Sequence, residues 1–192
     1  MSAPYSAHVI VRRALAISAI AVLALCGPST ADAQSLTIVA LGASNTHGMG
    51  RGATNMGVPR DQAFPAQLER MLRAKGVSAR VINAGVAGDT TGGMLARLDS
   101  AVPSGTGVLI LQPGGNDARR GVPDASRSAN IAEIKRRMGT REIPVIMLDR
   151  FGAGIGPYRL ADGQHFSAEG HAAVAARLVP QVLAAAGGRR RQ

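Results

Sequence analysis

The stretch Leu-Thr-Ile-Val-Ala-Leu-Gly-Ala-Ser-Asn, residues 36–45, decides the fold of this chain. A short apolar run rich in β-branched residues stops at Gly42, and Ser44 follows two positions later. This pattern predicts a buried strand that ends in a tight turn and carries a hydroxyl to the edge of a sheet. Open α/β sheets bind ligands at the carboxyl ends of their strands. Most serines in such turns only cap or turn the chain, so the rest of the sequence must decide what Ser44 does.

Three further strands are predicted along the chain, and helices separate them. The strands are expected at 80–83, 107–112 and 143–148, and the helices at 62–75, 91–101, 124–138 and 167–186. Asp124 and Ser167 are the expected N-caps of the last two helices, and a long loop is expected over 42–61. Regular alternation of strands and helices predicts an α/β fold with a mostly parallel sheet and helices on both faces.

The first 33 residues have the pattern of a secretory signal peptide. Arg12 and Arg13 precede the apolar run 14–26, and Ala31-Asp32-Ala33 resembles a cleavage site. A membrane anchor is the alternative, but this run is short of the roughly 20 residues that span a bilayer. Lipoprotein and twin-arginine signals fit less well. We therefore expect one periplasmic or secreted domain over 34–186, a disordered basic tail over 187–192, and no membrane span in the mature form.

The composition limits the partners and the chemistry of this domain. The only cysteine of the chain, Cys26, lies in the predicted leader, so the mature domain has neither a disulfide nor a thiol nucleophile. The formal charge is +10, and removing the leader takes away two arginines and one aspartate to leave +9. Only four aromatic residues remain, whereas nucleic-acid binders interleave stacking aromatics with basic residues. The sequence favours a small-molecule substrate over nucleic acid, and anionic envelope lipid is an alternative partner.

A serine nucleophile and its partners are present in the chain. A serine hydroxyl needs a base to take its proton, and an imidazole serves near neutral pH when a carboxylate holds its tautomer. The loop Asp162-Gly163-Gln164-His165 places both groups three residues apart. We predict Ser44 as nucleophile, His165 as base and Asp162 as its carboxylate. The alternatives are a surface histidine at 165 and a helix-capping aspartate at 162.

Hydrogen-bond donors for an oxyanion are the next requirement of such a site. The candidates are the backbone N–H groups of Ser44 and Gly88 and the side-chain amide of Asn116. Glycine at 88 leaves room for a close approach. The alternatives are a turn glycine at 88 and a helix cap formed by Asn116 and Asp117.

Other polar residues carry weaker predictions. We expect His47 to be a solvated loop residue and His171 to be structural or exposed. The aspartates at 89, 117 and 149 lack the spacing of a metal cluster, so no metal is predicted. The glycine-rich loop after the first strand lacks a phosphate-binding motif, so no nucleotide cofactor is predicted.

Four blocks of this sequence, in order, resemble the SGNH or GDSL-type hydrolases. They are Gly42-Ala43-Ser44, the stretch 83–91, Gly114-Gly115-Asn116-Asp117, and Asp162-Gly163-Gln164-His165. The exported bacterial esterases, arylesterases and thioesterase/lysophospholipases are the most similar branch. The resemblance implies a three-layer α/β/α flavodoxin-like fold, the Ser44–His165–Asp162 triad, and Gly88 and Asn116 in the oxyanion hole. It implies no cofactor.

Two departures from the family pattern accompany this resemblance. The family usually has Asp where this chain has Ala43, and the stretch 149–161 is too short for an extra helix and strand. We expect four or five strands and an open site. The predicted function is hydrolysis of carboxylic esters or thioesters with small acyl or aryl groups. The alternatives are a carbohydrate acetylesterase and a non-catalytic binding module, and the oligomeric state is left open.

Overall fold

The structure, a computed structural model, describes Met1 and residues 35–49, 56–154 and 156–189. The chain divides into two units, Met1–Asp32 and Ala33–Gln192, and the second unit contains all the described helices and strands. Apart from Met1, the predicted signal peptide and its cleavage site lie outside the described ranges, and so do the last three residues.

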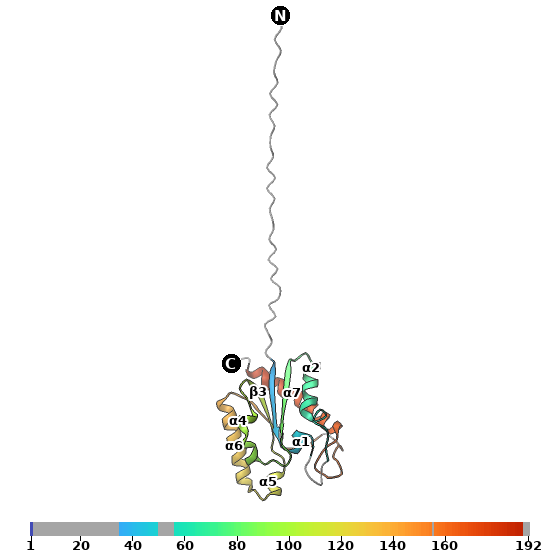
Figure 1. The fold of residues 1–192 in the computed structure, drawn as a ribbon, viewed down its shortest axis with the longest axis vertical. Coiled ribbons are helices and arrows are strands. Elements are labelled where there is room, and N and C mark those ends of the chain that lie inside the picture. The colour runs from blue at the N-terminus through green and yellow to red at the C-terminus, as the bar shows by residue number, and fades with distance from the viewer. Residues whose placement is uncertain (2–34, 50–55, 155, 190–192) are drawn as a thin grey trace. The chain divides into compact units, whose positions relative to one another are not determined.

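A four-stranded parallel sheet forms the centre of the domain. The strands are β1 (Leu36–Gly42), β2 (Ala79–Gly85), β3 (Thr106–Gln112) and β4 (Val145–Met147), in the order β2-β1-β3-β4 (Figure 1). This confirms the predicted parallel α/β fold. β4 is shorter than the predicted strand at 143–148, and no fifth strand occurs within the described ranges.

Among the residues that the structure describes, seven helices connect and follow the strands. They are α1 (Ser44–His47), α2 (Phe64–Ala74), α3 (Thr91–Ala96), α4 (Leu98–Ala101), α5 (Asn116–Arg119), α6 (Asp124–Thr140) and α7 (Ala168–Arg189). The short helices α1 and α5 were not expected, and the predicted helix at 91–101 is broken at Arg97. α7 extends through Gly187, Gly188 and Arg189, so these three residues of the predicted disordered tail are helical.

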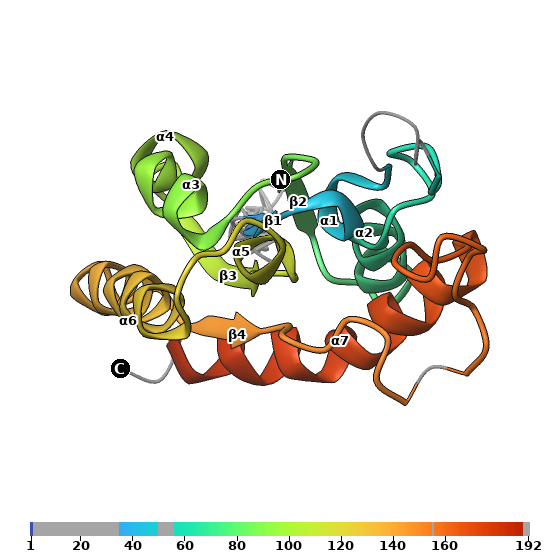
Figure 2. The same ribbon diagram turned by 90° about the horizontal axis from the view of Figure 1, so that it is seen from below.

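Helices cover both faces of the sheet, as Figure 2 shows: α2 and α7 lie on one side, and α3, α4 and α6 on the other. Because side chains alternate along a strand, β1 contributes to both cores. Ile38 and Ala40 pack with α2 and α7, while Val39 and Leu41 pack against the opposite helices. All seven residues of β3 are buried, as expected for a central strand in a parallel sheet.

The helix starts differ in part from the prediction. Asp124 is the first residue of α6 rather than its cap; Pro123 takes the cap position and makes no side-chain cap bond. Because the φ angle of proline is fixed near the helical value, Pro123 can precede α6 although its side chain has no hydroxyl to cap the helix. At the start of α7, Ser167 Oγ accepts a hydrogen bond from the Gly170 N–H at 3.4 Å, which agrees with the predicted cap.

In the ranges that the structure describes, no helix combines the length and the apolar character needed to cross a bilayer.

Candidate active site

Four loops leave the sheet at the carboxyl ends of its strands, and they carry the predicted site residues. The register pairs Gly42 at the end of β1 with Gly85 of β2 and Gln112 of β3, so these strands end level with one another. Gly85 also allows α1 to pack against the end of β2, because a Cβ there would lie 2.1 Å from the His47 backbone nitrogen. The serine turn is therefore held tightly against the neighbouring strand.

Gln112 holds the turn that carries Ser44. Its side chain is buried, and its Oε1 accepts hydrogen bonds from the Ala43 N–H at 3.2 Å and from the Thr46 hydroxyl at 3.1 Å. A backbone N–H can only donate, so this contact also sets the orientation of the Gln112 amide. Ala43 packs into the core below. Support for the turn thus comes from the adjacent strand, which binds the backbone of Ala43 and the side chain of Thr46.

Asp162 and His165 form a close pair, as predicted. Asp162 Oδ2 lies 2.5 Å from His165 Nδ1, while Oδ1 accepts hydrogen bonds from the backbone N–H groups of Gln164 at 2.9 Å and His165 at 3.0 Å. Burial raises the pKa of Asp162, but these hydrogen bonds outweigh it and lower the pKa to about 2. The carboxylate is therefore ionised at neutral pH, and the ring nitrogen that faces it carries a proton. In the neutral imidazole, Nε2 is then the basic atom.

The serine turn and the histidine loop are joined by a hydrogen bond. Asn45, next to Ser44, donates from Nδ2 to the carbonyl of Gln164, next to His165, at 3.2 Å. His165 Nε2 is buried, and it has no hydrogen-bond partner among the described residues, Ser44 included. The structure therefore brings the two loops together without closing a Ser44–His165 hydrogen bond. Such contacts are often long in unliganded enzymes and tighten when substrate binds.

The predicted oxyanion donors come from two adjacent loops. Asn116, the first residue of α5, donates from Nδ2 to the carbonyl of Asp89 at 2.7 Å, and its Oδ1 accepts from Arg119 Nη2 at 2.8 Å. This fixes the amide and leaves one of its two N–H donors for a ligand. Gly88, with φ +80°, is next to Asp89, and its carbonyl accepts from Arg120. The carbonyl that holds the Asn116 amide thus belongs to Asp89, the residue directly after Gly88.

A cavity of about 480 Å³ lies at this edge of the sheet. Ser44, Asn116 and Gln164 line it, and so do the rings of Phe151 and Phe166. Neither Gly88 nor His165 lines it; His165 is buried between two neighbours in the chain that do. The cavity therefore combines an apolar aromatic wall with polar groups from three of the four loops.

Two of the remaining polar residues have structural roles. Asp117 caps α3, accepting hydrogen bonds from the N–H of Thr91 and, at 2.6 Å, from its hydroxyl. His171 is fully buried rather than exposed, and its Nδ1 accepts from the Phe64 N–H at 3.1 Å. Burial, and secondly the charge of His165, lower the pKa of His171 to about 4.

His47 differs from the prediction of a solvated loop residue. It ends α1 and is half-buried, and burial, followed by the charge of Arg60, lowers its pKa. In the described ranges, no three His, Cys, Asp or Glu side chains gather where they could hold a metal ion.

Sequence inspection missed Gln112, the aromatic wall and three arginines of the cavity, Arg119, Arg150 and Arg159. Gln112 ends an apolar strand, and its polarity at a buried position was the available signal. The three arginines could not be predicted because arginine is scattered along the whole chain, and no local pattern distinguishes those that line a cavity.

Comparison with known proteins adds independent findings. Residues 40–188 match the model of the GDSL-like Lipase/Acylhydrolase family. Esterase TesA of Pseudomonas aeruginosa is 32% identical over 94 residues, which are 48% of this chain and 47% of that protein. An arylesterase of Vibrio mimicus is 35% identical over 78 residues, 40% of this chain and 39% of that protein. The aligned region thus spans less than half the length of either curated relative.

Solved structures show the same fold. AlinE4, described as an SGNH-hydrolase family esterase, matches with a TM-score of 0.51 and 35% identity over 59% of this chain and 58% of that one. A crystal structure of TesA matches with a TM-score of 0.66 over 78% of this chain and 99% of that one. At 22% identity, this second likeness concerns the fold alone.

Proposed function

Because this chain belongs to the GDSL-like Lipase/Acylhydrolase family, we propose that it is a serine esterase that hydrolyses carboxylic esters or thioesters of small acyl or aryl groups. One observation carries this proposal. The Asn45–Gln164 hydrogen bond at 3.2 Å joins the turn of Ser44 to the loop whose Asp162–His165 pair is already formed at 2.5 Å. The proposed nucleophile and the proposed base thus lie on two loops that a hydrogen bond joins.

In the proposed mechanism, His165 Nε2 takes the proton of the Ser44 hydroxyl as the oxygen attacks the ester carbonyl. Asp162 remains a carboxylate and stabilises the imidazolium that forms. The imidazolium then gives its proton to the departing alcohol or thiol, which leaves an acyl group on Ser44. Water, deprotonated by the same nitrogen, attacks the acyl group and frees the acid and the serine.

The tetrahedral intermediates carry a negative charge on the former carbonyl oxygen. The Ser44 N–H, the Gly88 N–H and the remaining N–H of the Asn116 amide are the proposed donors to that oxygen. The Asn116–Asp89 bond at 2.7 Å holds the amide before substrate arrives. Preorganised donors need no rearrangement during the reaction, which is why they stabilise charge more effectively than water does.

The phenylalanine rings of the cavity support a compact acyl or aryl substituent. Phe151 packs against Phe166 with ring centroids 5.0 Å apart, and both line the 480 Å³ space. A rigid aromatic wall favours a flat or short apolar group. Export to the periplasm or beyond, through a leader cleaved after Ala33, remains part of the proposal.

The test is a p-nitrophenyl ester series of increasing acyl length, measured on the wild type and on Ser44→Ala. We expect hydrolysis with a preference for short acyl groups, and a loss of at least about 10³-fold in kcat for Ser44→Ala. Asn116→Ala should lower kcat by roughly 10²- to 10³-fold, the usual loss for one oxyanion donor. Equal rates for the wild type and Ser44→Ala would refute the serine mechanism.

The open Ser44–His165 contact favours one competing function, a binding module that keeps the fold without catalysis. A fluorophosphonate probe separates the two, because it phosphonylates only an activated serine. Labelling of the wild type but not of Ser44→Ala supports the esterase. An unlabelled Ser44 in a folded protein supports the binding module.

A further inference from the structure

The cavity beside the proposed nucleophile is lined by three arginines from two separate segments. Arg119 belongs to α5, and Arg150 and Arg159 lie between β4 and α7. The same lining contains one acidic residue, Asp149, whose carboxylate is already paired with Arg127 at 3.4 Å. The cavity therefore carries positive charge that its own acidic residue does not neutralise.

These three arginines make no ion pair with any carboxylate in the described part of the chain. Arg119 and Arg159 instead donate to neutral oxygens, the Asn116 Oδ1 at 2.8 Å and the Gly163 carbonyl at 2.7 Å. A neutral acceptor orients a guanidinium without cancelling its charge. Each of these two arginines also keeps most of its five N–H donors for a ligand.

Arg159 is further held by an aromatic ring. Its guanidinium carbon lies 4.8 Å from the centroid of Phe166, which lines the same cavity. A stacked guanidinium loses less freedom when it binds an anion, because its plane is already set. Arg119, in turn, donates a hydrogen bond to the side chain of Asn116, so one of the three guanidinium groups contacts a proposed oxyanion donor directly.

We propose that the preferred ester carries an anionic substituent, a carboxylate or a phosphate, which Arg119, Arg150 and Arg159 bind while the ester carbonyl lies at Ser44. This substrate class rests on the proposed esterase function. The chemistry follows from the guanidinium, whose planar fork of donors matches the two oxygens of a carboxylate or phosphate. Binding the anion would also orient the scissile ester against the nucleophile, which raises the rate of attack.

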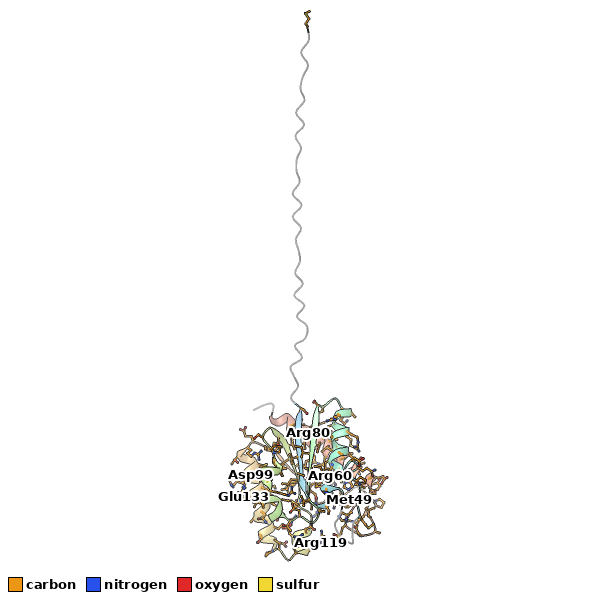
Figure 3. The ribbon with its side chains drawn as sticks, viewed as in Figure 1. Met49, Arg60, Arg80, Asp99, Arg119 and Glu133 are labelled. Atoms are coloured by element: carbon orange, nitrogen blue, oxygen red, sulfur yellow. The ribbon has the colours of Figure 1, made fainter. Side chains whose placement is uncertain are left out.

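The net charge of the whole domain is the competing cause of such a preference, because a basic protein attracts any anion. A control variant at Arg80 distinguishes the charge of the whole domain from the charge of the cavity. It is an exposed residue of β2, and Figure 3 shows it at the opposite end of the sheet from Arg119. Arg80→Gln and Arg119→Gln remove the same charge from the protein, but only the second removes it from the cavity.

The experiment compares three aryl acetates that differ in one substituent: 4-acetoxybenzoate, 4-acetoxyphenyl phosphate and the neutral 4-acetoxybenzamide. The measured quantity is kcat/KM for each anionic ester divided by kcat/KM for the amide. We expect a ratio of about ten or more in the wild type and a fall of roughly fivefold or more in Arg119→Gln and Arg159→Gln. Arg80→Gln should change the ratio by less than about twofold, because it lies on the surface far from the cavity.

The two anionic esters distinguish carboxylate from phosphate as the preferred group. Use of a ratio removes any general effect of Arg119→Gln on Asn116, since that effect acts on all three esters alike. A wild-type ratio near one, or an equal fall in Arg80→Gln and the cavity variants, would overturn the proposal while leaving the esterase intact. Failure of the wild type to hydrolyse any of the three esters would overturn the esterase proposal, and the anion preference with it.

Discussion

Gln112→Met is the most informative perturbation of the serine turn. Methionine has nearly the length of glutamine but no acceptor, so the substitution removes both hydrogen bonds to Oε1 with little change in volume. The Ala43 N–H and the Thr46 hydroxyl are buried, and each costs about 1–2 kcal/mol when left without an acceptor. We expect the free energy of unfolding to fall by about 2–4 kcal/mol.

The matched control is Thr46→Val, which removes one of the two donors and leaves Gln112 bonded to Ala43. It should cost about 1 kcal/mol. The double variant should cost less than the sum of the single variants by about 1 kcal/mol, because it replaces both partners of the Thr46–Gln112 hydrogen bond and leaves neither of these two side chains unsatisfied. Urea unfolding followed by circular dichroism measures all four proteins.

Activity supplies the second part of this test. The turn held by Gln112 carries Ser44, and a displacement of about 1 Å can cost roughly 10²-fold in rate. We expect kcat for p-nitrophenyl acetate to fall about 10- to 100-fold in Gln112→Met and less than about fivefold in Thr46→Val. Strict additivity of the unfolding free energies, together with unchanged kcat in Gln112→Met, would refute the assigned role of Gln112.

Two further predictions concern stability. The pKa of His171 is lowered from 6.5 to about 4, so between these pH values the unfolded chain binds a proton at His171 and the folded chain does not. The free energy of unfolding therefore falls as the pH drops from about 6.5 to about 4, by about 3 kcal/mol in all. His171→Asn keeps an acceptor for the Phe64 N–H but cannot titrate. Urea unfolding at about pH 7 and pH 4.5 should therefore show a smaller loss of stability between the two pH values in the variant than in the wild type. Equal losses in the two proteins would contradict this account. Gly85→Ala should lower the free energy of unfolding by at least about 2 kcal/mol, because its Cβ would meet the His47 backbone at 2.1 Å. Gly139→Ala in α6 has open space around it and should instead raise stability by about 0.5–1 kcal/mol; thermal unfolding compares the two, and equal shifts would be contrary to expectation.

The sequence predicted the architecture well because the relevant patterns are local. The all-apolar run of β3 and the mixed run of β1 indicate buried strands whatever lies around them. Helix boundaries were less certain. The break at Arg97 is tied to long-range contacts, since this side chain pairs with Asp89 at 2.8 Å and donates to the Gly42 carbonyl at 3.2 Å. No local pattern encodes such a contact.

The Asp162–His165 pair was predictable for the same reason of locality. Three residues separate the two side chains, and a turn of that length lets a carboxylate reach a ring nitrogen. Ser44, Gly88 and Asn116 were candidates because they follow the predicted strands, and the family blocks supported them. Which of them face the cavity was a different question, and His165 and Gly88 proved to lie outside its lining.

The amino-acid sequence alone determined the parallel α/β class, the family and the candidate serine, histidine and aspartate, because these depend on periodicity and on short spacings. Only the tertiary structure decided that Gln112 holds the serine turn, that Asn45 joins it to the histidine loop, and that arginines meet phenylalanines in one cavity. Those contacts join residues far apart in the chain, and they exist only once the parallel strands bring their carboxyl ends to a common edge.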